Sequence, residues 1–245
     1  MTHWLFDLGN TRLKIAPLAA GGEPGEVVAI AHGDGDFAAA IEAALPRGGD
    51  TAYLASVASA QATATLQEAL SQRFARTVAA RTAAEFAGLR IAYANPDKLG
   101  VDRFLALLAA HARGGAWLVA GVGTALTIDL LDAEGAHRGG RIAPSPALMR
   151  AALHQRARQL PEVGGDYAEF ADDTEAALAS GCEGAAAALI ERSLAKAAEA
   201  LGAPPGLLLH GGGADALAAH LPQAQIASHL VLRGLAQWAH RSGGE

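Results

Sequence analysis

The sequence predicts an α/β protein made of two duplicated halves, each a mixed sheet with a three-strand meander flanked by helices. Short apolar runs separated by glycine-containing turns open both halves, and segments with helical spacing of apolar residues follow each of them. The composition agrees with this class, because 29 of 245 residues are Gly and only 5% are aromatic. Small residues allow close backbone approaches, which favours an α/β core over an all-β sandwich.

The first half, residues 1–114, opens with three strands joined by tight turns. Apolar runs bounded by Gly, Asn and Pro mark the strands. Gly100 and Asp102 mark the start of the last helix. The predicted strands are 4–7, 12–17, 26–32 and 51–56, and the predicted helices are 37–45, 60–74 and 100–112.

The second half, residues 115–245, repeats this order. A short apolar run at 207–210 ends at three consecutive glycines. The predicted strands are 117–121, 126–131 and 137–142, and the predicted helices are 146–159, 174–200, 214–221 and 230–240. No low-complexity linker separates the halves, so we expect the boundary near Gly114 and Gly115 to be a packed hinge.

Charge and cysteine content exclude several classes of function. The 19 Lys and Arg residues against 25 Asp and Glu residues leave a net charge of -6, so we expect neither a nucleic-acid partner nor a membrane partner. The single cysteine, Cys182, excludes an internal disulfide and cysteine-based zinc sites, and we expect an inert, helix-facing thiol. Residues 1–7 reach a carboxylate too early for a signal peptide, so we expect a soluble cytoplasmic protein.

The polar turn between the first two strands is the first candidate site. Gly9 has no side chain, so backbone N–H groups there can face a phosphate. Asn10 and Thr11 add hydrogen-bond donors, and Lys14 on the returning strand adds a cation. Asp7 at the strand end can hold Mg²⁺ directly or through water, because Mg²⁺ needs few carboxylates. The alternative is a polar hairpin, although a turn alone does not require all of these residues.

Residues 93–103 form the second candidate site. Asn95 and Pro96 end any preceding helix, so Asp102 falls in the first turn of the next helix, beside Arg103. In a structural role, Asp102 would be a carboxylate stabilised by the helix dipole. In a catalytic role, it would orient a hydroxyl group and accept its proton during phosphoryl transfer. The residues alone leave both interpretations open.

A second glycine-rich turn at 121–124 occupies the same place in its half as the first turn. Gly123 and Thr124 suit a second phosphate clamp. Leu126 stands where a dinucleotide fingerprint needs its third glycine, and a strand follows instead of a helix. The His-Gly-Gly-Gly run at 210–213 is similar to an esterase oxyanion hole, but the chain lacks Gly-x-Ser-x-Gly. An adenine or ribose site fits that run better, and a P-loop is also absent from the sequence.

These motifs, in this order, resemble those of type III pantothenate kinases, a family in the superfamily of actin and the sugar kinases. The resemblance covers nearly the whole chain. Its most distinctive segment is 93–103, whereas the motif at 7–14 is shared across the superfamily. The other matching segments are 123–129, 137–142 and 174–181. The resemblance implies two actin-like ATPase (ribonuclease H-like) halves, 1–114 and 115–245.

The resemblance also implies ATP-dependent phosphorylation of the primary hydroxyl of pantothenate to 4'-phosphopantothenate, the first step toward coenzyme A. Asp102 would accept the proton, Asp7 would hold Mg²⁺ directly or through water, and Asp129 is a further candidate metal ligand. Family members are homodimers with the acceptor site near the interface, which Thr174 would reach from the partner chain. The implied ATP contacts are Asp7, Gly9, Asn10, Thr11, Arg12, Lys14 and Thr124. The implied pantothenate contacts are Tyr93, Gly100, Val101, Asp102, Arg103 and Thr174.

Two positions depart from the family's pattern. An Asp two residues before the Gly-Thr-Ala run commonly holds a monovalent cation such as K⁺ or NH₄⁺, and Gly121 stands there in this chain. A bound K⁺ would lose its strongest local attraction, so we expect weak or absent K⁺ dependence. Ser145 stands where glycine is usual, which predicts a modest backbone change.

Two other functions remain open at this stage. One is a kinase of another small hydroxyl substrate within the same superfamily, because the first motif does not select the acceptor. The other is a non-catalytic regulatory or accessory protein, because the change at Gly121 is compatible with functional drift. The presence of Asp7, Asp102 and Thr124 favours catalysis over the second alternative.

Overall fold

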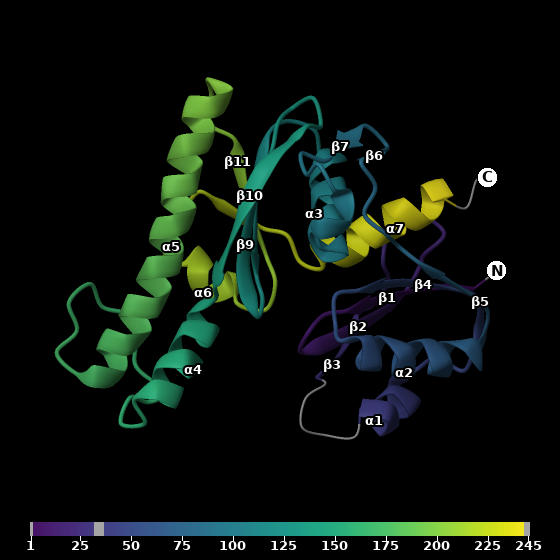
Figure 1. Ribbon diagram of the computed structural model, residues 1–245, viewed down its shortest axis with the longest axis horizontal. Coiled ribbons are helices and arrows are strands. Elements are labelled where there is room, and N and C mark those ends of the chain that lie inside the picture. Colours follow the sequence, from purple (N-terminus) through teal and green to yellow (C-terminus); the bar gives the residue numbers. More distant parts are fainter. Residues whose placement is uncertain (1, 32–36, 243–245) are drawn as a thin grey trace. The chain divides into compact units, whose positions relative to one another are not determined.

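The computed structural model describes residues 2–31 and 37–242, and these residues form two compact units. The first unit contains residues up to Arg113 and those from His229 onward, and the second is the continuous stretch Gly114–Ser228. Each unit contains a five-stranded sheet with helices packed on it (Figure 1).

The two sheets have the same topology, which confirms the predicted duplication. In the first sheet, with order β3-β2-β1-β4-β5, three antiparallel strands are followed by two parallel ones. The second, β10-β9-β8-β11-β12, repeats this arrangement. The strands of the first sheet are β1 (His3–Leu8), β2 (Arg12–Pro17), β3 (Val28–Ala31), β4 (Gly49–Ser56) and β5 (Phe74–Ala79). Those of the second are β8 (Trp117–Val122), β9 (Ala125–Leu131), β10 (His137–Pro144), β11 (Gly206–His210) and β12 (Ala224–Ile226).

The helices bury apolar faces against these sheets. In the first unit, Ile41 and Leu66 contribute to one core with Phe6, Leu13 and Leu54 of the sheet. The remaining elements of the first unit are α1 (Phe37–Ala44), α2 (Ala60–Ser71), β6 (Glu85–Phe86), β7 (Leu89–Arg90), a 3-10 turn at Pro96–Lys98, α3 (Val101–His111) and α7 (Leu230–Ser242). Those of the second unit are α4 (Pro146–Arg156), α5 (Thr174–Leu201) and α6 (Ala214–Ala218).

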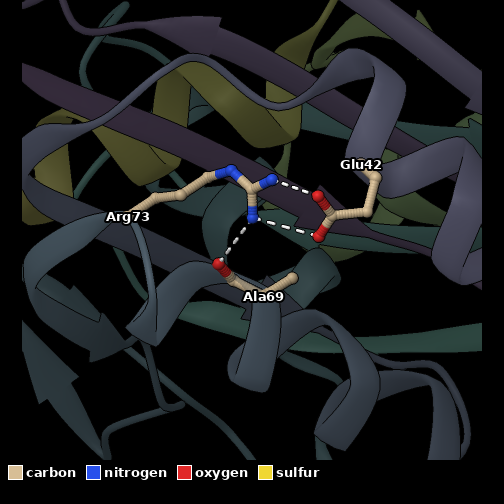
Figure 2. A network of polar contacts seen from close by, with 3 residues as sticks. All are labelled: Glu42, Ala69 and Arg73. Atoms are coloured by element: carbon tan, nitrogen blue, oxygen red, sulfur yellow. Dashed lines mark hydrogen bonds and ion pairs between the residues drawn. The ribbon is translucent and has the colours of Figure 1, made fainter.

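Arg73, just after α2, fixes the two helices of that layer to each other. Its guanidinium forms a bidentate pair with Glu42 of α1 and donates to the carbonyl of Ala69, 3.2 Å away (Figure 2). The planar fork of arginine suits this two-point contact with a carboxylate. The hydrogen bond from Arg73 lowers the pKa of Glu42 below its usual value.

The predicted helix at 60–74 ends early in the structure. Helix α2 stops at Ser71, and Phe74 instead opens strand β5 with its side chain buried. Phe74 lies four residues after Leu70 and eight after Leu66, so its spacing also fits a helix. The predicted helix at 146–159 likewise ends at Arg156, and that at 214–221 ends at Ala218. Residue 32, the predicted end of the third strand, lies outside the described residues.

Helix α7 belongs to the first unit, whereas we expected all of 115–245 to form the second half. Its Gly234 lies directly on the backbone of Leu105 in α3, where a Cβ would collide with the Leu105 carbonyl. This close crossing of α3 and α7 explains the difference, because the apolar face of α7 packs on an element from the first half. Along the sequence, the first unit runs to Arg113 and the second begins at Gly114, next to the expected hinge at Gly114 and Gly115.

Cys182 lies on α5 with 4% exposure, and burial raises the pKa of its thiol. An un-ionised, buried thiol is a poor nucleophile. Among the described residues, no helix is both long enough and apolar enough to cross a bilayer.

Candidate functional site

The β1–β2 hairpin holds an acid and a base side by side. Asp7 and Lys14 are paired in the antiparallel register, and Lys14 Nζ lies 3.7 Å from Asp7 Oδ2. The turn closes with a 3.0 Å hydrogen bond from the Gly9 N–H to the Arg12 carbonyl. Asn10 and Thr11 at its tip are exposed, so their polar groups are accessible to a ligand.

Asp7 is a buried carboxyl group with a raised pKa. It is 7% exposed, and burial, opposed by Lys14 and reinforced by the charge of Asp102, raises its pKa from 3.8 to about 6. Two carboxylates that repel one another in a buried setting favour either a shared proton or a bound cation. The structure therefore brings Asp7 and Asp102 into one electrostatic environment, although 94 positions separate them in the sequence.

Asp102 lies in the first turn of α3, where a carboxylate is favoured by the helix dipole. Its Oδ1 accepts a 2.8 Å hydrogen bond from the N–H of Arg103. Gly100 precedes it at the helix N-cap, and a Cβ on Gly100 would lie 2.5 Å from the same oxygen. Glycine at position 100 thus provides the space that this orientation of the Asp102 carboxylate needs. Val101 lies between them and is partly buried.

Tyr93 and Arg103 form a second pair next to Asp102. Arg103 is 6% exposed, its Nη1 donates to the Tyr93 hydroxyl at 3.3 Å, and its guanidinium carbon lies 5.8 Å from the Tyr93 ring centre. A buried guanidinium is a strong site for a carboxylate or phosphate group. The predicted residues of the segment 93–103 are therefore close to one another in the folded chain.

The turn after β8 presents Gly123 and Thr124 to solvent in the second unit. Ser145, which the sequence suggested would only alter the backbone, has a definite role here. Its hydroxyl donates to the Thr124 carbonyl at 3.0 Å and accepts from the Leu148 N–H at 3.2 Å, capping α4. Sequence reasoning missed this contact, although a Ser before Pro-Ala-Leu is a recognisable helix start.

Asp129, the further candidate metal ligand, is buried beside a histidine of the neighbouring strand. It is 3% exposed, and its Oδ1 lies 3.0 Å from Nε2 of His137, which is 2% exposed. That hydrogen bond gives the buried carboxylate a polar partner within the chain. No group of three or more potential metal ligands occurs within 2–31 and 37–242.

Thr174 is the first residue of α5 and is exposed. It borders a cavity of about 500 Å³ whose wall includes Leu160, Asp172 and Leu178. The α5 N-terminus is capped by Asp173, which accepts from the Ala176 N–H at 2.8 Å. Thr174 thus belongs to the second unit, whereas the other predicted acceptor contacts belong to the first.

A profile of the type III pantothenate kinases matches residues 4–196, which is most of the chain. The chain belongs to the type III pantothenate kinase family. It is 58% identical over 245 residues to a type III pantothenate kinase of Stenotrophomonas maltophilia (strain K279a), and the match covers 100% of both chains. It is 59% identical over 240 residues to that of Xanthomonas euvesicatoria pv. vesicatoria (strain 85-10), covering 98% of both.

Solved structures share the fold of this family member at much lower identity. A Baf family protein from Campylobacter jejuni superimposes with a TM-score of 0.66 at 19% identity, covering 99% of this chain and 100% of that one. An archaeal actin homolog gives a TM-score of 0.54 at 11% identity, covering 98% and 100%. The actin-like architecture expected for a type III pantothenate kinase is confirmed by these likenesses and by the two repeated sheets.

Proposed function

We propose that this chain transfers the γ-phosphate of ATP to the primary hydroxyl of pantothenate. The observation that carries the proposal is the arrangement of Asp7, Lys14 and Asp102 in one unit of a type III pantothenate kinase family member. Phosphoryl transfer depends mainly on positioning and on neutralising charge. The Asp7–Lys14 ion pair, the glycine-containing turn between them and the oriented carboxylate of Asp102 are groups that suit this chemistry.

Asp102 is the proposed proton acceptor. Its carboxylate is oriented by the Arg103 N–H and by the space at Gly100, so it can align a hydroxyl group for attack. Tyr93, Gly100, Val101, Arg103 and Thr174 are proposed contacts of pantothenate. The buried guanidinium of Arg103 is suited to the carboxylate of that substrate.

Gly9, Asn10, Thr11, Arg12 and Lys14 are proposed contacts of ATP, together with Thr124 of the second unit. Mg²⁺ fits the donor set at Asp7, because a buried carboxylate with a raised pKa beside a second acid gains from a divalent cation. One carboxylate is enough, since Mg²⁺ retains waters and phosphate oxygens as its other ligands. When bound, the ion would neutralise charge on the transferring phosphate.

The decisive experiment is mass spectrometry of the purified protein after incubation with Mg·ATP and pantothenate. We expect phosphopantothenate and ADP in equal amounts. Turnover of another small alcohol but not of pantothenate would support the alternative kinase. Binding of ATP without any turnover, in a folded protein, would support the regulatory alternative. Either result would overturn the proposal.

We also propose that the protein is a homodimer. Three large apolar side chains on β10 and α4 are exposed, with Ile142 at 66%, Leu148 at 42% and Leu153 at 43%. An apolar cavity of about 630 Å³, formed by α4 and α5, adjoins Leu148 and Leu153. Exposed apolar surface beside an apolar cavity is typical of protein–protein contacts, and a second copy of this surface is the proposed occupant.

Analytical ultracentrifugation at micromolar concentration tests the dimer. We expect the wild type to sediment as a dimer and Leu148→Glu to shift it toward the monomer. Val28, half exposed on β3 of the first unit, provides the matched control, since Val28→Glu should leave the dimer intact. A monomeric wild type, or equal effects of both variants, would contradict the proposal.

A further inference from the structure

Three residues lie in register at the ends of three neighbouring strands of the second sheet. Gly121 of β8 pairs with Thr127 of β9 on one side and with His210 of β11 on the other. Their neighbours Ala120, Leu126 and Leu209 point into the core cluster. Because side chains alternate along strands, Thr127 and His210 project from the opposite face.

The imidazole of His210 fills the space above Gly121. A Cβ on residue 121 would lie 2.8 Å from His210 Nε2, 3.0 Å from its Cε1 and 2.8 Å from Thr127 Oγ1. Even an alanine would require the ring or the hydroxyl to move. His210 can therefore occupy its observed position only because residue 121 is a glycine.

A monovalent cation does not fit this arrangement. Such ions are held by oxygen ligands, and a carboxylate would be the strongest of them. Residue 121 provides no carboxylate, and the space where its side chain would begin is taken by an imidazole nitrogen. The K⁺ or NH₄⁺ implied by the resemblance thus lacks a carboxylate ligand at Gly121, and His210 lies against that position.

His210 lies at the junction of two glycine-rich turns. The Gly213 N–H donates to the Val122 carbonyl at 3.1 Å, which links the turn after β11 to the turn after β8. The second of these turns carries Gly123 and Thr124. The N–H groups of Gly123 and Gly213 donate to carbonyl groups within these turns. An imidazole N–H beside glycine-rich turns is a donor of the kind that binds phosphate oxygens.

We propose that His210, held over Gly121, is a nucleotide-phosphate ligand that replaces the monovalent cation in this chain. The inference rests on the proposed kinase function. It assigns His210 the task of donating a hydrogen bond to a phosphate oxygen of ATP. It also makes Gly121 a positioning residue, which acts only by leaving room for the imidazole.

The first test compares kcat and KM for ATP in K⁺ and in Na⁺ buffers of equal ionic strength. We expect the wild type to change by less than about twofold, because only nonspecific screening acts. We expect His210→Ala to lower kcat/KM for ATP by about 10- to 100-fold, the range for a lost hydrogen bond to a charged group. His210→Gln, which keeps an N–H donor, should recover part of that loss. His240, exposed on α7, provides the control variant His240→Ala.

The second test measures ADP affinity by calorimetry, so it does not depend on turnover. His210→Ala and Gly121→Ala should each weaken ADP binding. The double variant should bind ADP no more weakly than His210→Ala alone, because both substitutions act through the same imidazole. Thermal unfolding checks that each variant is folded. Strict K⁺ dependence of the wild type, or unchanged ADP affinity in folded His210→Ala, would overturn the inference. Absence of phosphopantothenate in both buffers would instead overturn the kinase proposal, while the ADP measurement would still test His210.

Discussion

The Cβ that Gly100 lacks would lie 2.5 Å from Oδ1 of Asp102. This relationship ties the orientation of the proposed proton acceptor to a residue with no functional group. It also explains why a side chain is absent at the N-cap of α3, where Ser, Thr or Asp usually provide a capping oxygen.

We expect Gly100→Ala to lower kcat by about 10- to 100-fold, because small misplacements of a positioning group carry penalties of this order. The added methyl group would push the Asp102 carboxylate out of its present orientation. Gly21→Ala is a matched control, since no atom lies within 4 Å of the added methyl group. Steady-state kinetics with both variants checks this, and a Gly100→Ala enzyme with wild-type kcat would contradict the positioning role.

Asp102→Asn tests the proton acceptor itself. The amide keeps the size of the carboxylate but cannot accept a proton, so kcat should fall by about 10²–10⁴-fold, the usual range for a general base. ATP binding, measured by calorimetry, should be retained. A variant with near wild-type kcat would remove Asp102 from this role.

Asp7→Asn should stabilise the protein at neutral pH in metal-free buffer. Because the pKa of Asp7 is raised to about 6 in the folded state, the folded chain keeps a proton that the unfolded chain releases above about pH 4. Wild-type stability therefore falls as pH rises from about 4 to about 6, by at most about 3 kcal/mol. In Asp7→Asn the side chain at this position does not titrate, so the variant should not lose this stability as the pH rises.

Urea unfolding in EDTA at pH 4 and at pH 7.5 measures this difference. The gain of Asp7→Asn over the wild type should appear at pH 7.5 and shrink toward zero at pH 4. A gain of equal size at both pH values would contradict it. The same variant should need more Mg²⁺ for activity, so its stability gain would come with a loss of function.

Gly234→Ala should destabilise the first unit even though alanine is the better helix former. The methyl group would meet the backbone of Leu105, which cannot turn away as a side chain can. We expect a loss of about 1–3 kcal/mol, as for overpacking of a core. Gly181→Ala on α5, with no atom within 4 Å, should instead gain about 0.5–1 kcal/mol. Unfolding curves of the two variants should thus shift in opposite directions.

Local signals in the sequence predicted most of the fold. Strand β2 and the start of α5 agree with the predicted bounds, because apolar alternation and the Asp173 cap are encoded by adjacent residues. Strand β5 was not predicted, because only Phe74 of its six residues is buried and the strand therefore shows little alternation of buried and exposed residues. The placement of α7 depends on a contact with α3, which no local pattern reports.

The candidate site was predictable to the extent that its residues are contiguous. Asp7 and Lys14 share a hairpin, and Tyr93 and Arg103 share one segment. The run at 210–213 was predicted as an adenine or ribose site, but the contact of His210 with Gly121 was not, because Gly121 lies on a neighbouring strand, 89 positions earlier. The hydrogen bond between Asp129 and His137 could not be predicted either, because it forms across a hairpin.

The return of α7 to the first unit has a consequence for biosynthesis. The ribosome delivers the second unit as one uninterrupted stretch, but the first unit lacks helix α7 until residues 230–242 have been added. Until then, the α3 backbone at Leu105 has no covering helix. The emerging chain can therefore finish its second unit first, so the unit that carries Asp7 and Asp102 matures only after α7 has been synthesised.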